Sequence, residues 1–185
     1  MENSDVDETQ KKSARWSPEL IVAVFAVVIG VATMFVYIYQ ARIMGRQMRA
    51  SSWPYLETIY SNTTGSFSII VKNKGTGPAI VRNAVVRFDD KSFPDSQKNI
   101  DSVIYLMTGS RGILNSYTNV NNRVISPGET INFVEISDST KVSLFLKSVQ
   151  KHSTALVVCY CSVFDECWTM VGNKVEKCED CKALK

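Results

Sequence analysis

The stretch from Leu20 to Tyr39 constrains the fold most, because its twenty residues contain no charged residue and no proline. At about 1.5 Å per residue, a helix of this length measures about 30 Å, the hydrocarbon thickness of a bilayer. A helix in a soluble core would carry a polar stripe, and this stretch has none. Trp16 precedes it, and Tyr37 and Tyr39 lie at its far end, where aromatic residues are expected at a membrane interface. The pattern predicts one membrane-spanning helix over 20–39.

A cleaved signal peptide is the alternative to a retained span. Its apolar region would cover about 7–15 residues and end at an Ala-x-Ala-like site. The stretch here is longer, and Gln40-Ala41-Arg42-Ile43-Met44 follows it. We therefore expect a single-pass membrane protein.

The segments beside the span set the expected helix bounds. Residues 1–17 are polar and charged, so we expect a disordered N-terminal tail. Ser17 and Pro18 suit the N-cap and the first helical position. No residue except Gly45 interrupts the helical pattern before Pro54, so the sequence predicts a helix over 18–51.

Small residues recur along one face of the span at steps of three and four: Ala23, Ala26, Gly30 and Thr33. Such residues let helices approach closely in lipid, which makes this face a candidate for helix–helix packing and a homo-oligomer. The alternative is that they are ordinary span composition.

Arg42, Arg46 and Arg49 share one face just after the span. They are candidates for contact with anionic headgroups of the lipid bilayer, at about 1 kcal/mol for each charge. They are equally typical of a stop-transfer flank, and the two interpretations are compatible.

The flanking charges do not decide the orientation of the span in the membrane, because three basic residues stand on each side of it. The acidic tail could cross a membrane easily, and clustered cysteines are safer in a reducing compartment. These two points favour a cytoplasmic C-terminal domain, and a periplasmic one is left open.

From Trp53 onward the apolar pattern alternates, as in strands. Seven strands are expected, at 55–60, 66–73, 79–88, 117–125, 130–136, 154–164 and 167–171. Two short amphipathic helices lie between them, the first capped by Asp95 or Ser96. Their apolar faces are Ile100, Val103, Ile104 and Met107, and Val142, Phe145, Leu146 and Val149. The sequence predicts an immunoglobulin-like β-sandwich over 53–173.

Two turns punctuate this region. Lys74-Gly75-Thr76-Gly77-Pro78 lacks the spacing and the following helix of a phosphate loop, so we interpret it as a turn. Ser126-Pro127-Gly128-Glu129 has proline and glycine where a type II turn requires them.

All five cysteines lie near the C-terminus: Cys159, Cys161, Cys167, Cys178 and Cys181. Cys159 and Cys161 point to one face of a strand, and the favoured interpretation is that they are small buried hydrophobes. Residues 174–185 are expected to form a charged tail with a CxxC motif. Zinc binding or a disulfide remains open for Cys161, Cys167, Cys178 and Cys181.

Little else in the chain suggests catalysis. His152 is expected to be a solvated loop residue, and Asp89-Asp90 to be solvated charges. No common catalytic motif is present, and the net charge of +3 is dispersed. We therefore expect no enzyme activity, no cofactor and no nucleic-acid partner.

Four stretches resemble a group of uncharacterised bacterial single-span membrane proteins with a small β-rich C-terminal domain. They are Ala50–Glu57, Asn73–Ala79, Arg123–Glu129 and Val158–Trp168. The resemblance covers roughly 49–168 and implies a membrane-anchored β-domain in the bacterial inner membrane. It also implies a paired role for Cys161 and Cys167, and it departs at Asp165, where glycine is expected.

These features predict a membrane-anchored, non-enzymatic binding or scaffolding protein with an unknown protein partner. A thiol, disulfide or zinc protein using the C-terminal cysteines is the first alternative. A small accessory subunit of a larger membrane complex is the second.

Overall fold

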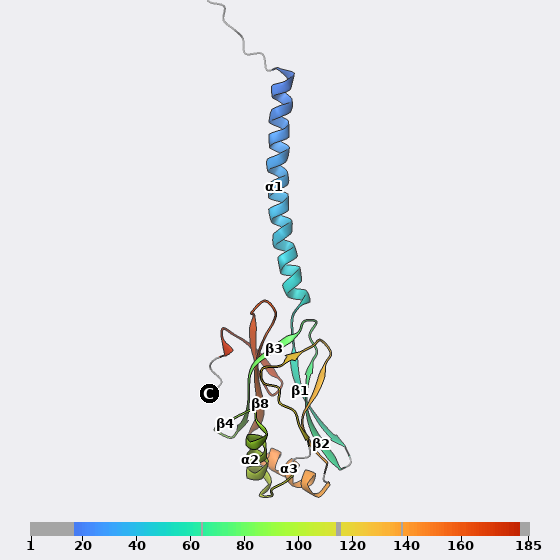
Figure 1. Ribbon diagram of the computed structural model, residues 1–185, viewed down its shortest axis with the longest axis vertical. Helices are drawn as coiled ribbons and strands as arrows, with labels where there is room; N and C mark the ends of the chain where they lie inside the picture. The colour runs from blue at the N-terminus through green and yellow to red at the C-terminus, as the bar shows by residue number, and fades with distance from the viewer. Residues whose placement is uncertain (1–16, 64, 114–115, 138, 182–185) are drawn as a thin grey trace, which may run out of the picture. The chain divides into compact units, whose positions relative to one another are not determined.

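The computed structural model describes residues 17–63, 65–113, 116–137 and 139–181. The tail expected over 1–17 therefore lies, apart from Ser17, outside the described residues. The chain divides into two compact units between Arg46 and Gln47. The first unit holds most of one long helix, and the second holds the end of that helix and a β-rich domain (Figure 1).

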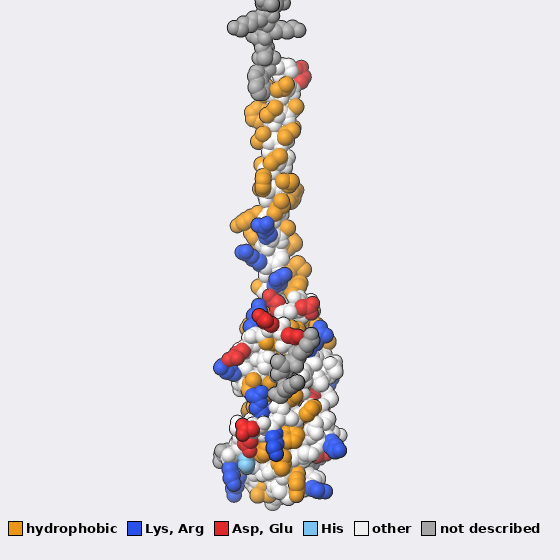
Figure 2. Space-filling model, turned by 90° about the vertical axis from the view of Figure 1, so that its left-hand side faces the viewer, with side chains coloured by type: hydrophobic (Ala, Val, Ile, Leu, Met, Phe, Trp, Pro, Cys, Tyr) orange, Lys and Arg blue, Asp and Glu red, His pale blue; other side chains and the backbone are white. Residues whose placement is uncertain are grey.

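Helix α1, Pro18–Ser51, agrees with the range expected from the sequence. The backbone N–H of Leu20 donates to the Ser17 carbonyl at 3.0 Å and meets the Ser17 hydroxyl at 3.4 Å. No residue of α1 is buried, and its mean hydropathy reaches 2.7 over 18 residues. Figure 2 shows hydrophobic side chains along most of α1 and basic ones near one end. The helix is long and apolar enough to span a membrane.

The described residues of the β-domain form ten strands in two sheets, and their strand pairs are all antiparallel. The first sheet has the order β1 (Leu56–Thr63), β2 (Ser66–Asn73), β7 (Thr130–Ile136) and β5 (Ser116–Tyr117). The second has the order β10 (Lys174–Cys178), β9 (Cys167–Val171), β8 (Thr154–Cys161), β3 (Ala79–Phe88) and β4 (Lys91–Pro94). Strand β6, Val124–Ile125, pairs with β3. The β-rich prediction is confirmed, but ten strands replace the seven expected.

Two helices close one end of the domain, as Figure 1 shows. They are α2, Gln97–Thr108, and α3, Ser139–Lys151. The apolar residues expected on their inner faces are buried in the shared core or packed against it: Ile100, Val103, Ile104, Met107, Val142, Phe145, Leu146 and Val149. Ser96 is the N-cap of α2, without a side-chain capping hydrogen bond.

The strand expected over 117–125 is wrong, because the segment crosses from one sheet to the other. Buried Asp95 holds it midway, accepting hydrogen bonds from the backbone N–H groups of Val120 at 2.9 Å and Asn121 at 3.0 Å. Its carboxylate also accepts from the Tyr117 hydroxyl at 2.5 Å. Burial and this bond raise the pKa of Tyr117 above its ordinary value. Captured by Asp95, the segment pairs only at its ends, as β5 and β6.

The expected charged tail from 174 is also wrong over its first half. Residues 174–178 form β10, which pairs with β9 from Lys174 opposite Val171 to Cys178 opposite Cys167. Residues 172 and 173 form a two-residue connection, and Gly172 has φ of 58°. The β-domain therefore extends past 173 to the cysteines.

Asn73 organises the turn that the sequence predicts after β2. Its amide N–H₂ donates to the carbonyls of Gly77 at 2.8 Å and Ile125 at 3.0 Å. Its amide oxygen accepts from the backbone N–H groups of Tyr55 at 3.2 Å and Gly75 at 2.9 Å. Every hydrogen-bonding position of this fully buried amide is used. The Asn73 side chain thus joins the residue that precedes β1, strand β6 and the turn.

The glycine at position 77 is required by close packing. A Cβ there would lie 2.0 Å from the Ser52 carbonyl oxygen, which no side chain can do without moving backbone. The type II turn predicted at 126–129 is confirmed by the φ of 77° at Gly128 and by the bond from the Glu129 N–H to the Ser126 carbonyl.

His152 and Asp89 are paired rather than free in solvent as expected. The Nδ1 atom of His152 lies 3.0 Å from an Asp89 carboxylate oxygen, and its ring packs on Phe88 with centroids 5.0 Å apart. Asp89 also accepts from the Ser153 N–H at 3.1 Å. The pair joins the end of α3 to the turn after β3.

Candidate functional site: a cluster of five cysteines

Strand β8 places two cysteines on the face of its sheet turned away from the main core. Tyr160 points into the core, where its hydroxyl accepts from the Leu56 N–H at 3.3 Å and its ring lies 6.0 Å from that of Trp168. Because side chains alternate along a strand, Cys159 and Cys161 point to the opposite face. All five cysteines pack there as a cluster separate from the main core.

The register of the neighbouring strands brings more sulfur to this face. Cys161 lies directly opposite Cys167 on β9, and Cys167 lies directly opposite Cys178 on β10. Directly paired residues share a face, so these three side chains form a row across three strands. Cys181 follows three residues later and completes the cluster.

Four of the five cysteines form disulfides. One joins Cys159 to Cys181, and the other joins Cys161 to Cys167 across the β8–β9 hairpin. Cys159 and Cys161 are buried, as the favoured interpretation holds, but they are disulfide-bonded rather than small free hydrophobes. The Cys159–Cys181 link falls on a pair that the sequence did not single out.

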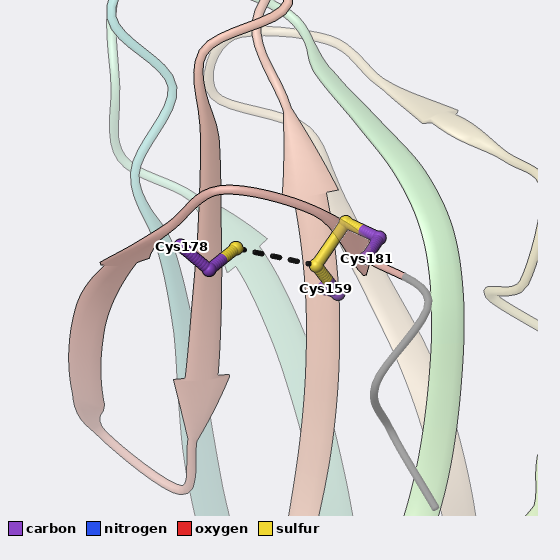
Figure 3. A group of neighbouring side chains, drawn as sticks. All are labelled: Cys159, Cys178 and Cys181. Carbon is purple, nitrogen blue, oxygen red and sulfur yellow. Dashed lines mark hydrogen bonds between the residues drawn. A yellow bond between two sulfur atoms is a disulfide. The ribbon is translucent and has the colours of Figure 1, made fainter.

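The remaining thiol belongs to Cys178, and it points at the first disulfide (Figure 3). Its Sγ lies 3.6 Å from the Sγ of Cys159. The two disulfides also approach each other, since the Sγ atoms of Cys181 and Cys161 are 3.8 Å apart. A continuous chain of sulfur contacts therefore runs from Cys178 to Cys167.

The five cysteines of this cluster differ in their exposure to solvent. Cys178 is half-buried. The other four side chains are at most 9% exposed. Cys178 is therefore the most exposed of the five cysteines.

The disulfides also stabilise the domain. They close loops with sequence separations of 22 and 6 residues. Loop-closure entropy assigns about 3 kcal/mol to the longer and about 2 kcal/mol to the shorter. The long one fixes the chain after β10 onto β8.

Metal binding was one prediction for these residues. Two sets of sulfurs lie within 4.8 Å of one another: Cys159, Cys178 and Cys181, and Cys161, Cys167 and Cys181. A zinc ligand must be a thiolate, and each set contains a disulfide. With both disulfides formed, the cluster offers one thiolate and fits disulfide chemistry better than zinc.

The residues predicted to act in the membrane all lie on α1 and are exposed: Ala23, Ala26, Gly30, Thr33, Arg42, Arg46 and Arg49. Thr33 donates its hydroxyl hydrogen bond to the Ile29 carbonyl at 2.7 Å, so its polar group is satisfied within the helix. Packing through this face and headgroup contact stay predictions.

One apolar cavity lies inside the β-domain, between the sheets and under α2 and α3. Phe67, Ile104, Phe133 and Phe145 are among its lining residues, and its volume is about 60 Å³. Ligand pockets measure roughly 300–1,000 Å³. This cavity is too small for a metabolite.

No protein-family model matches the chain, and no curated protein matches its sequence significantly.

Proposed function

We propose that this protein is a membrane-anchored thiol–disulfide exchange protein, with Cys178 as the residue that meets the external thiol. The observation that carries the proposal is the 3.6 Å approach of the half-buried Cys178 sulfur to a buried disulfide. The Cys178 thiolate attacks the Cys159 sulfur, a Cys159–Cys178 bond forms, and Cys181 leaves as a thiolate.

This internal step presents the oxidised sulfur to solvent. An external thiolate attacks Cys178, forms a mixed disulfide and releases the Cys159 thiolate. A second external thiolate then attacks the mixed disulfide, releasing Cys178 and one external disulfide. Two external thiols lose two electrons and two protons, and one protein disulfide becomes two thiols. Exchange with an external disulfide restores the protein.

The same two disulfides also support a proposal for the compartment. Disulfides persist in oxidising environments and are rare in the bacterial cytosol. The two disulfides favour a periplasmic β-domain, opposite to the side that the sequence analysis favours. We propose a single-pass protein of the bacterial inner membrane, held by α1, with its β-domain in the periplasm. An immunoglobulin-like class for this domain remains part of the proposal, supported by its two antiparallel sheets.

The test is the oxidation of reduced glutathione by the full-length protein in mild detergent. Wild type should oxidise the thiol and carry a glutathione mixed disulfide at Cys178, found by mass spectrometry after an acid quench. Cys178→Ser should slow the oxidation at least tenfold. Glu176→Ser is the matched control, because it changes an exposed residue of the same strand. Equal rates in all three proteins would overturn the proposal.

Binding or scaffolding, the role that the sequence favours, stays a prediction. Its test is recovery of a partner with the full-length protein from mild detergent, compared with a chain lacking the β-domain. A partner retained by Cys178→Ser would separate this role from exchange chemistry.

A further inference from the structure

We infer that the five cysteines form a relay, in which the Cys161–Cys167 disulfide is reduced through Cys178 by way of Cys181 and Cys159. The inference rests on the proposed function, because that function assigns the exchange with external thiols to Cys178. It adds a second step and a second oxidising equivalent.

The contacts give the order of the steps. The first exchange, at the 3.6 Å contact, frees the Cys181 thiolate. That sulfur already lies 3.8 Å from Cys161, so it attacks Cys161 and Cys167 leaves as a thiolate. The protein then holds Cys159–Cys178 and Cys161–Cys181 disulfides with a free Cys167 thiol. One thiol and two disulfides are present before and after, so no electron is gained or lost.

External thiols reduce both protein disulfides by attacking the same residue, Cys178. After external thiols reduce Cys159–Cys178, the Cys159 thiolate attacks Cys181 and frees Cys161. Cys178 then attacks Cys159 again, and a second pair of external thiols is oxidised. Each round removes two electrons from external thiols, so one protein chain can oxidise four.

The relay would give external thiols a route to a disulfide that is buried. Cys161 is 3% exposed and Cys167 is 9% exposed, so direct attack on their disulfide is hindered. The relay connects this buried disulfide to the half-buried Cys178.

The experiment follows both disulfides separately while the full-length protein in detergent reacts with reduced glutathione. Samples are quenched in acid, thiols are alkylated, and peptides are mapped against time. In wild type both disulfides should be lost, and a peptide pair linked through Cys161 and Cys181 should appear during the reaction. Complete absence of that link would overturn the relay.

Variants locate each step. Cys178→Ser should slow the loss of both disulfides at least tenfold. Cys181→Ser should slow the loss of Cys161–Cys167 as strongly, with Glu176→Ser reacting as wild type. Loss of Cys161–Cys167 at the wild-type rate in Cys181→Ser would overturn the relay, whether the route is solvent or the neighbouring Cys178.

The two proposals fail in different ways. If Cys178→Ser protects Cys159–Cys181 alone, exchange at Cys178 stands and the relay is wrong. If Cys178→Ser protects neither disulfide, both are wrong. A thermal melt of each variant reports whether the fold is kept, and the Cys161–Cys181 link is measured in wild type, where folding is not in question.

Discussion

Replacing Asn73 with alanine should destabilise the β-domain more than any ordinary surface change. The substitution removes four hydrogen bonds, two of them to the buried carbonyls of Gly77 and Ile125. At about 1 kcal/mol for each bond, and up to about 3 for a buried group left unpaired, we expect a loss of about 3–6 kcal/mol. Domains of this kind have about 5–15 kcal/mol in total.

The assay is thermal unfolding of the full-length protein in detergent, followed by tryptophan fluorescence. For a domain of this size the loss corresponds to a Tm lower by about 10–20 °C. Asn62→Ala is the matched control, because Asn62 is exposed on β1, the strand that pairs with the strand of Asn73. We expect it to change stability by no more than about 0.5 kcal/mol.

Asn73→Asp sharpens the test. It keeps the shape but turns the amide N–H₂ toward two carbonyls into an acceptor, and it buries a charge. We expect it to be at least as destabilising as alanine. A melt of Asn73→Ala that matches Asn62→Ala would refute the reasoning that this amide joins three segments.

Three further predictions use the same structure. Gly77→Ala should lower the Tm in a thermal melt, because the added methyl group would collide with the backbone of Ser52. Gly45→Ala is the control and should leave the Tm unchanged, because a Cβ there meets no atom within 4 Å. Equal Tm values for the two variants would contradict this. Burial raises the pKa of Tyr160 to about 12, so stability should fall as pH rises from about 10 to 12, when only the unfolded chain releases this proton. Urea titrations should show a shallower fall for Tyr160→Phe, and an unchanged slope would argue against it. Gly30→Leu should abolish crosslinking of α1 in membranes if its small-residue face packs, whereas Val28→Leu should not; equal crosslinking would make that face ordinary span composition.

The helices and the long strands were predictable because their apolar periodicity is local. The faces of α2 and α3 follow directly from spacing, and β8 is apolar on both sides because it is central in its sheet. The break between β5 and β6 was not predictable in this way. It depends on Asp95, which is more than twenty residues away and captures the backbone of that segment.

The candidate site was half predictable. The Cys-x-Cys spacing places Cys159 and Cys161 on one face, and the hairpin turn brings Cys167 near. Asp165 adopts φ of 57° in that turn, the conformation for which glycine is expected. The missed signal is Gly172-Asn173 between alternating residues, which is typical of a two-residue hairpin. Recognising it would have placed Cys178 in a strand, although the Cys159–Cys181 link would still require the three-dimensional path.

The most direct test of the central claim is a map of thiols and disulfides in the native full-length protein. The protein is extracted under acid, alkylated without reduction, and digested for mass spectrometry, with metal content measured in parallel. We expect Cys159–Cys181 and Cys161–Cys167 as the main linked peptides, with alkylation mainly at Cys178 and no stoichiometric zinc. Five alkylated cysteines, or one zinc ion per chain, would contradict it.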